Sequence, residues 1–292
     1  MPPNPAPEGR PAVALAYHSA TGGTRLVVEL LADLLSPDLR VRTIDIQDAG
    51  AVAAIQGPDL VVFGYPTHFV KPSRSMKEFI DRLPSVERPR KAFVLTTYEL
   101  YTENSLRRCA RMLKDKGWMV TGSAAVRAPG ADVTCLLPDR LCAWLYRFQR
   151  DLPGKMRAIA REVRALARTD GGPRLPAIKW YTPFSRLLQA GLLDGFYEWR
   201  KRIRILPDRC TDCGVCLAVC SRGAWVRRGA ALGHDPSRCE LCTRCIHRCP
   251  RKAIVLIPLV KDNRRLDPRL YARLKDAARA KLGLTGGATG AR

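Results

Sequence analysis

Short apolar runs alternate with amphipathic segments through the first 170 residues. Runs suited to strands cover the following ranges: Ala12–Tyr17, Val41–Ile46, Leu60–Tyr65, Ala92–Thr97 and Met119–Val126. Helical character recurs between them, over the following segments: Leu26–Leu34, Ser73–Leu83, Glu103–Lys116 and Pro153–Ala167. Strands that alternate with helices predict an α/β domain built on a doubly wound parallel sheet of five strands.

The second half of the chain follows another pattern. Arg209–Val226 and Arg238–Val255 are two copies of one segment, offset by 29 residues, with four cysteines in matching places. Duplication of a small metal-binding unit explains this repeat. We therefore expect the following organisation: a disordered lead-in at 1–11, the α/β domain at 12–170, an aromatic-rich connector at 171–205, the repeat domain at 206–257, and a C-terminal segment at 258–292.

Two of these segments carry further expectations. The connector holds six aromatic residues, and it either packs against the domains or offers a docking surface; they are Trp180, Tyr181, Phe184, Phe196, Tyr197 and Trp199. The C-terminal segment predicts a basic helix over Pro268–Leu282, followed by a flexible glycine-rich tail.

Composition narrows the class of protein. Hydrophobic residues make up 46% of the 292 positions and charged residues 26%, as in an ordinary globular protein. No apolar run approaches the roughly 20 residues that span a bilayer, and no signal peptide opens the chain, so we expect a cytoplasmic protein. Eight of the 11 cysteines fall between Cys210 and Cys249. Such clustering in a cytoplasmic protein indicates metal ligands rather than a disulfide scaffold. Cys109, Cys135 and Cys142 are expected to be buried structural thiols.

Each copy of the repeat contains the spacing C-x2-C-x2-C-x3-C. This run is typical of [4Fe–4S] clusters, in which the fourth cysteine ligates the other cluster. The expected ligands of the first cluster are Cys210, Cys213, Cys216 and Cys249. Those of the second are Cys239, Cys242, Cys245 and Cys220. Zinc is the alternative metal, but its structural sites usually pair two separated C-x2-C knuckles.

These runs resemble bacterial two-cluster ferredoxins over some fifty residues. That family has proline after the fourth cysteine, which Pro250 matches and Ser221 does not. A Ser221 N–H or hydroxyl that donates to a sulfur would raise the potential of the neighbouring cluster. His234 and His247 lie near the runs, but eight thiolates leave no need for them as ligands.

The loop Ser19-Ala20-Thr21-Gly22-Gly23-Thr24 joins the first predicted strand to the first helix. Small hydroxyl residues and glycines there expose backbone N–H groups at a helix N-terminus, which suits a phosphate. The loop lacks the lysine of the nucleoside-triphosphate loop and the G-x-G-x-x-G pattern, so ATP and NAD are disfavoured.

The same loop resembles the [ST]-x-T-G-x-T loop of flavodoxins, and this resemblance implies a flavodoxin-like fold that binds FMN. Ser19, Thr21 and Thr24 match the hydroxyls that hold the FMN phosphate. Two further loops match the flavin-binding places of that fold at the carboxyl ends of strands: Gly64-Tyr65-Pro66-Thr67-His68, and Thr96-Thr97-Tyr98-Glu99-Leu100-Tyr101, of which Thr97, Tyr98 and Tyr101 are the expected contacts. Tyr65, Tyr98 or Tyr101 would stack on the flavin ring, with ordinary packing as the alternative for each. His68 is more simply a hydrogen-bonding loop residue, and no catalytic residue is assigned.

The chain from residue 11 to 257 resembles the flavodoxin–ferredoxin fusion proteins of anaerobic bacteria and archaea. The resemblance implies electron transfer between FMN, two [4Fe–4S] clusters and an external redox partner. One alternative is an iron–sulfur flavoprotein oxidoreductase, whose flavin reduces a small substrate with electrons from the clusters. A buried cavity beside His68 and Tyr98 would favour that enzyme, whereas an open flavin edge would favour a carrier. A more remote alternative is an iron–sulfur protein that binds nucleic acid or has a regulatory role.

Charge bears on the partner. Fifty Lys and Arg against 27 Asp and Glu give a formal charge of +23, whereas ordinary bacterial ferredoxins and flavodoxins are acidic. Basic residues in the repeat domain and just before it include Arg200, Lys201, Arg202, Arg204, Arg222, Arg227, Arg228, Arg238, Arg244, Arg248, Arg251 and Lys252. We expect them to steer an acidic redox protein, a ferredoxin or a reductase. An arginine-rich composition with no steering is the alternative. No nucleic-acid motif is visible, and we expect neither a nucleic-acid partner nor an integral membrane segment.

Overall fold

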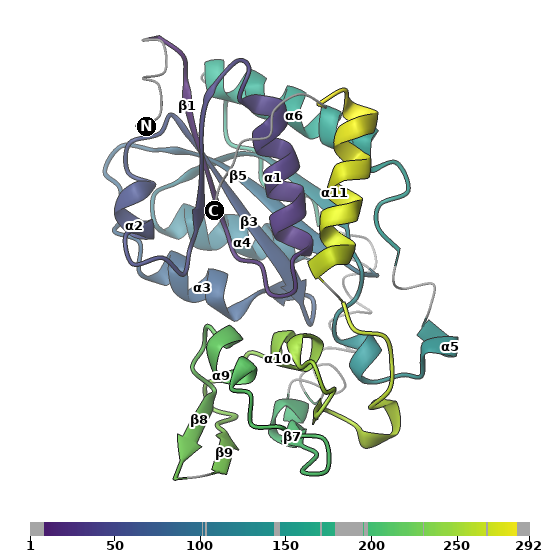
Figure 1. Ribbon diagram of the computed structural model, residues 1–292. Helices are drawn as coiled ribbons and strands as arrows, with labels where there is room; N and C mark the ends of the chain where they lie inside the picture. The colour runs from purple at the N-terminus through teal and green to yellow at the C-terminus, as the bar shows by residue number, and fades with distance from the viewer. Residues whose placement is uncertain are drawn as a thin grey trace, which may run out of the picture.

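The computed structural model describes residues 9–100, 102, 104–142, 147–169, 171–178, 195, 198–229, 231–266 and 268–284. Tyr101, the lead-in before residue 9, most of the connector's aromatic residues and the tail after residue 284 therefore lie outside the described residues. The described chain forms two parts (Figure 1). The larger, the α/β unit, holds residues 9–169 together with the last helix. The smaller, the cysteine unit, holds residues 198–266.

A parallel sheet forms the centre of the α/β unit. Its strands lie in the order β2-β1-β3-β5-β6, and their bounds are β1 (Ala12–Tyr17), β2 (Arg40–Asp45), β3 (Leu60–His68), β5 (Lys91–Tyr98) and β6 (Met119–Arg127). Without the short β4 (Lys71–Pro72), which pairs antiparallel to the end of β3, this is the flavodoxin-like order 2-1-3-4-5. The predicted fold class is confirmed.

The sheet is covered on both faces, which is why its inner strands β1, β3 and β5 are apolar on both sides. On one face lie α1 (Gly23–Leu35), α6 (Leu152–Arg168) and α11 (Pro268–Leu282). On the other lie α2 (Ala51–Ala54), α3 (Arg74–Asp81) and α4 (Ser105–Asp115). No described helix is long and apolar enough to cross a membrane.

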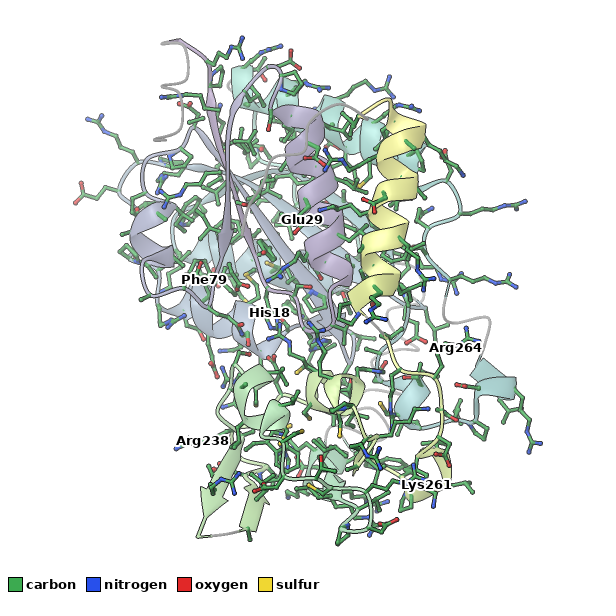
Figure 2. The ribbon with its side chains drawn as sticks, in the orientation of Figure 1. His18, Glu29, Phe79, Arg238, Lys261 and Arg264 are labelled. Atoms are coloured by element: carbon green, nitrogen blue, oxygen red, sulfur yellow. The ribbon has the colours of Figure 1, made fainter. Side chains whose placement is uncertain are left out.

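The last helix returns to the α/β unit after the chain has passed through the cysteine unit (Figure 1). It has the predicted bounds, but its packing against α1 and α6 was not expected. Lys275 Nζ lies 2.8 Å from Glu29 Oε2, and Glu29 points from α1 towards α11 in Figure 2. Arg279 lies 3.5 Å from Asp33 on the same two helices. Two basic residues of the predicted basic helix therefore attach it to α1.

The cysteine unit repeats its own backbone. Its elements are η4 (Glu198–Arg202), β7 (Arg204–Ile205), α9 (Val215–Val219), β8 (Trp225–Arg228), β9 (Ala231–His234), α10 (Arg244–Arg248), β10 (Ile254–Val255) and η5 (Pro258–Val260). Helices α9 and α10 stand at equivalent positions of the two copies. Three pairs of residues with positive φ also coincide: Asp212 with Leu241, Gly214 with Thr243, and Gly223 with Lys252. Four of these six are not glycine, so both copies adopt the same unfavourable turns.

Two short elements, η1 (Val133–Cys135) and α5 (Asp139–Cys142), follow β6 and lead towards the cysteine unit. The predicted thiols Cys109 and Cys135 are buried, and the side chain of Cys142 lies outside the described residues. Trp199, the described aromatic residue of the connector, packs against the core of the cysteine unit.

Candidate functional site

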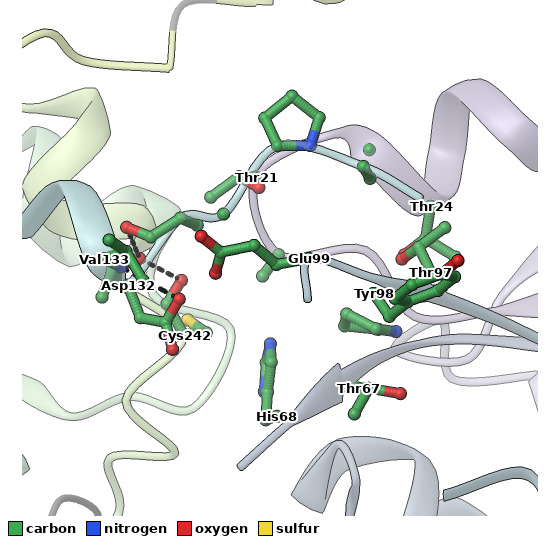
Figure 3. A pocket seen from close by; sticks show the side chains of 18 of the residues that line it. Thr21, Thr24, Thr67, His68, Thr97, Tyr98, Glu99, Asp132, Val133 and Cys242 are labelled. Atoms are coloured by element: carbon green, nitrogen blue, oxygen red, sulfur yellow. Dashed lines mark hydrogen bonds between the residues drawn. The ribbon is translucent and has the colours of Figure 1, made fainter. Parts of the chain in front are cut away.

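A cavity of about 310 Å³ lies at the carboxyl ends of the strands, between the α/β unit and the cysteine unit (Figure 3). Its lining includes ten of the residues predicted to bind FMN: Ser19, Ala20, Thr21, Gly23, Thr24, Pro66, Thr67, His68, Thr97 and Tyr98. Leu241, Cys242 and Thr243 of the second cysteine run line the same cavity. The predicted flavin loops and one predicted cluster ligand therefore meet in one place.

The predicted phosphate loop ends where α1 begins. Gly22, the residue before this helix, has no side chain to cap it, so the backbone N–H groups of Gly23 and Thr24 in the first turn have no capping side chain. Ser19 Oγ accepts a bond of 3.1 Å from the Arg25 N–H, and Thr24 Oγ1 lies 2.8 Å from Thr97 Oγ1 on β5. Gly22 has a φ of +121°, a conformation that favours glycine. The loop has the neutral, N–H-rich character that a phosphate needs.

Three described residues that were predicted to bind FMN do not line the cavity: Gly22, within the phosphate loop itself, and Gly64 and Tyr65 on β3. Tyr65 is fully buried in the core on the α3 and α4 side of the sheet, where Ser105 Oγ lies 3.4 Å from its hydroxyl. Gly64 faces α1, where a Cβ would stand 3.1 Å from Val28. Neither lines the cavity, because β3 runs on through Pro66 to His68 instead of ending at Tyr65, and its last three residues reach the cavity in their place.

Two acidic residues to which the sequence analysis assigned no role also line the cavity, and one of them, Glu99, lies within the second predicted flavin loop. Glu99 stands directly after β5, and Asp132 follows β6, so both occupy carboxyl ends of strands. Burial and the nearby Asp132 carboxylate raise the pKa of Glu99 to about 9, against the opposing charge of Arg127. A Cβ on Gly130 would stand 1.9 Å from the Glu99 carboxyl carbon, so glycine makes room for this side chain.

Two polar atoms in this cavity are buried without a hydrogen-bond partner among the described residues. They are Glu99 Oε1 and His68 Nδ1. Figure 3 shows the Glu99 carboxyl above the His68 ring, with Asp132 to one side. Buried polar atoms normally have partners, so two unpartnered atoms in one cavity indicate a ligand with a polar edge.

The cysteine unit is fixed to the α/β unit by buried polar contacts. Glu240, next to Cys239, accepts bonds of 2.9 Å from both the backbone N–H and the hydroxyl of Ser75. His18, at the boundary of the two units in Figure 2, lies 3.4 Å from Glu240, and burial lowers its pKa to about 4. Although burial favours the neutral acid, His18 and Ser75 help to lower the pKa of Glu240. An imidazole and a carboxyl group therefore face each other within the buried boundary.

Three further contacts cross the same boundary. Arg244 donates to the backbone carbonyls of Ser19 and Ala20, which ties the predicted phosphate loop to the second cysteine run. Arg222 donates to Glu78 on α3 at 2.9 Å. His247 Nε2 lies 2.7 Å from the Ala131 carbonyl oxygen. Sequence reasoning missed this boundary because its partners lie more than 110 residues apart.

The structure brings the cysteines together in two sets that cross between the repeats. A small cavity of about 20 Å³ is lined by Cys210, Cys213, Cys216 and Cys249, which we call the outer set. The inner set consists of Cys220, Cys239, Cys242 and Cys245. Burial raises the pKa of Cys245 to about 12, and its neighbours Cys239 and Cys220 raise it further. Cys213 is exposed, whereas Cys242 faces the large cavity.

Backbone donors to sulfur fit this arrangement. The N–H groups of Ala224 and Ala253 donate to Cys220 and Cys249 at 3.3 and 3.2 Å, at equivalent positions of the repeat. Such bonds stabilise thiolates that ligate iron. Ser221 is exposed, and both fourth cysteines accept the same backbone bond. Among the described residues no group of three or more His, Cys, Asp or Glu side chains is placed to bind a single metal ion. The ten cysteines whose side chains are described are free of disulfides.

Comparison with known proteins adds little. No protein-family model and no curated protein matches the chain. An archaeal flavodoxin shares 13% sequence identity at a TM-score of 0.40. The match covers 54% of this chain and 99% of the flavodoxin. The two-electron reduced flavodoxin of Megasphaera elsdenii shares 16% sequence identity at a TM-score of 0.41, and the match covers the same fractions of the two chains. An NADH:FMN oxidoreductase in its apo form shares 17% sequence identity at a TM-score of 0.40, over 53% of this chain and 89% of the oxidoreductase. Scores this low carry no functional argument, so the fold assignment rests on the strand order.

Proposed function

We propose that this protein relays electrons between a bound FMN, two [4Fe–4S] clusters and an external redox partner. The observation that carries the proposal is that Cys242 lines the same cavity as the phosphate-type loop from Ser19 to Thr24. A flavin held there would lie beside the ligands of one cluster. Its position at the carboxyl ends of the strands is the usual ligand place of this fold class.

The flavin site is assigned as follows. The loop from Ser19 to Thr24 would hold the phosphate with neutral hydroxyls and backbone N–H groups. The ring would occupy the space between His68 at the end of β3 and Tyr98 at the end of β5, where Glu99 presents a protonated carboxyl. When bound, FMN supplies the exchange between two-electron and one-electron transfer. Tyr101, which we also predicted to contact the ring, lies outside the described residues and remains a prediction.

The two cysteine sets suggest a direction along the molecule. The outer set includes the exposed Cys213, and the inner set includes Cys242 at the flavin cavity. A [4Fe–4S] cluster on each set would place an entry point at the surface and a second centre next to the flavin. We therefore propose the order external partner, outer cluster, inner cluster, flavin.

The test is the cofactor content of the full chain after anaerobic purification. We expect one FMN per chain, with about eight iron and about eight sulfide from two [4Fe–4S] clusters. Zinc without sulfide would contradict the clusters, and a chain that takes up no flavin would contradict the flavin site.

A second candidate function rests on the two unpartnered polar atoms in the cavity, Glu99 Oε1 and His68 Nδ1. Groups that hold or receive a proton beside a flavin suit reduction of a small substrate, because such reductions need protons as well as electrons. The protein would then be an iron–sulfur flavoprotein oxidoreductase. The two functions differ in one respect: an enzyme turns over a small oxidised substrate, and a carrier exchanges electrons only with other redox proteins.

The external partner is proposed to be an acidic redox protein. The basic residues of the cysteine unit do not all face solvent. Arg222 and Arg244 make contacts at the boundary with the α/β unit. Arg204 and Arg251 are exposed, and Arg251 borders the outer cysteine cavity. Positive charge at the proposed entry point suits an acidic docking face.

Electron exchange with an acidic ferredoxin should slow steeply as salt is added. The Debye length falls from about 30 Å at 0.01 M to about 8 Å at 0.15 M, which screens long-range steering. Arg251→Glu should lower the bimolecular rate at low salt, measured by stopped-flow mixing. Arg42→Glu, an equal charge change at an exposed position on the edge strand β2, should leave the rate nearly unchanged. A rate indifferent to salt would leave the arginine-rich composition without a steering role.

A further inference from the structure

Helix α11 places a tyrosine on the predicted phosphate loop. A Cβ on Gly22 would stand 2.9 Å from a ring carbon of Tyr271, and a Cβ on Gly23 would stand 3.9 Å from the Tyr271 hydroxyl oxygen. Tyr271 therefore occupies the space that side chains at these two loop positions would need. The ring is only 6% exposed, and it packs edge-on against Phe148 with centroids 6.1 Å apart.

The Tyr271 hydroxyl is buried and has no well-formed hydrogen bond with a described residue, although the Thr21 side chain of the loop lies close enough to interact with it. Burial raises the pKa of this phenol to about 12, while the neighbouring Thr21 side chain opposes the rise. The phenol therefore keeps its proton throughout the physiological range. A buried hydroxyl normally finds a partner, so an unpartnered donor beside a phosphate-type loop indicates an acceptor that binds there.

The loop also lacks a charged side chain of its own. Its hydroxyls belong to Ser19, Thr21 and Thr24, and the Thr24 hydroxyl is shared with Thr97. Arg244, from the cysteine unit, donates to the backbone carbonyls of Ser19 and Ala20. A further neutral donor would therefore strengthen phosphate binding without changing the character of the loop.

We propose that the Tyr271 hydroxyl is a fourth hydroxyl of the phosphate site and donates a hydrogen bond to the phosphate of the bound flavin. This inference rests on the flavin site proposed above. It means that α11, which follows both cysteine runs in the chain, completes a site that begins at residue 19. The ion pairs of α11 with Glu29 and Asp33 hold the helix in the required place.

The test compares two flavins on the full chain with its clusters in place and its flavin removed. Tyr271→Phe keeps the ring and removes only the hydroxyl. We expect FMN to bind about tenfold more weakly to this variant, a loss of about 1.4 kcal/mol. Riboflavin, which has no phosphate, should bind the variant and the wild type equally. Dissociation constants are measured by quenching of flavin fluorescence under anaerobic conditions.

Phe148→Leu is the matched control, because it changes the aromatic neighbour of Tyr271 without removing a hydroxyl from the site. It should not change the ratio of FMN to riboflavin affinity. An equal loss for both flavins in Tyr271→Phe, or no loss for either, would overturn the role of the hydroxyl while the flavin site itself stands. A wild-type protein that binds neither flavin would overturn the flavin site and the Tyr271 inference together.

Discussion

Alanine at Cys210 and alanine at Cys249 should each remove the same iron–sulfur cluster, although the two residues belong to different copies of the repeat. Both line the small outer cavity with Cys213 and Cys216. We expect each variant to fall from about eight to about four iron per chain, because the other cluster keeps all four ligands. The remaining cluster should give the same electron paramagnetic resonance spectrum in both variants.

The complementary pair is Cys220→Ala and Cys239→Ala, which should remove the inner cluster instead. Cys109→Ala serves as the control, because Cys109 is buried in the core of the α/β unit and should leave all eight iron in place. If Cys210→Ala and Cys249→Ala leave spectroscopically different clusters, then the ligands do not cross and each repeat binds its own cluster.

These variants also separate the proposed positions of the two clusters. Loss of the outer cluster should slow electron delivery from a protein partner, while small reductants that diffuse to the inner cluster should still reduce the flavin. Loss of the inner cluster should interrupt the route between the surface and the cavity. The basis is the exposure of Cys213 and the place of Cys242 on the cavity wall.

Much of the architecture followed from the sequence because its signals are local. Apolar runs such as Leu60–Tyr65 and Ala92–Thr97 identify strands that are covered on both faces, and each observed strand includes most of its predicted range. The last helix has the predicted bounds. The 29-residue repeat reappears as matching left-handed turns at Asp212 and Leu241, and at Gly214 and Thr243.

The placement of Tyr65 shows where local reasoning failed. Along β3 the residues Val61, Phe63 and Tyr65 share one face, and all three are buried on the α3 and α4 side. Because successive side chains of a strand point to opposite faces, Tyr65 shares the face of Val61 and Phe63. Its place in a predicted flavin loop therefore did not indicate where its side chain points. The β3–β4 hairpin then places the cavity contacts two or three residues further along, at Thr67 and His68.

Other site residues were beyond sequence reasoning because their roles depend on distant partners. Glu99 acquires its raised pKa only through burial beside Asp132, and Tyr271 reaches the phosphate loop from the far end of the chain. Glu240 meets Ser75 across 165 positions. A single sequence offers no signal for such pairs. A glycine at 130 and an acidic residue at the end of a strand were the available hints for Glu99.

A carboxylate at position 21 should empty the flavin site. Thr21 lines the cavity in the middle of the phosphate-type loop, and Thr21→Asp would set a negative charge against the phosphate dianion. Two unit charges 4 Å apart repel by about 4 kcal/mol at an effective dielectric constant of 20. Part of this repulsion is relieved by relaxation and solvent, and we expect FMN to bind at least about a hundredfold more weakly, a loss of about 2.7 kcal/mol.

Thr21→Asn is the matched control, because asparagine has nearly the shape of aspartate without its charge. It should keep most of the affinity for FMN, and both variants should keep about eight iron per chain, since position 21 lies outside the cysteine runs. Riboflavin separates charge from shape: it carries no phosphate, so Thr21→Asp should weaken it far less than FMN. If Thr21→Asp instead binds FMN as tightly as Thr21→Asn does, no phosphate lies at this loop. The flavin would then have to enter the cavity in another orientation, and the roles assigned to Ser19, Thr24 and Tyr271 would fail with it.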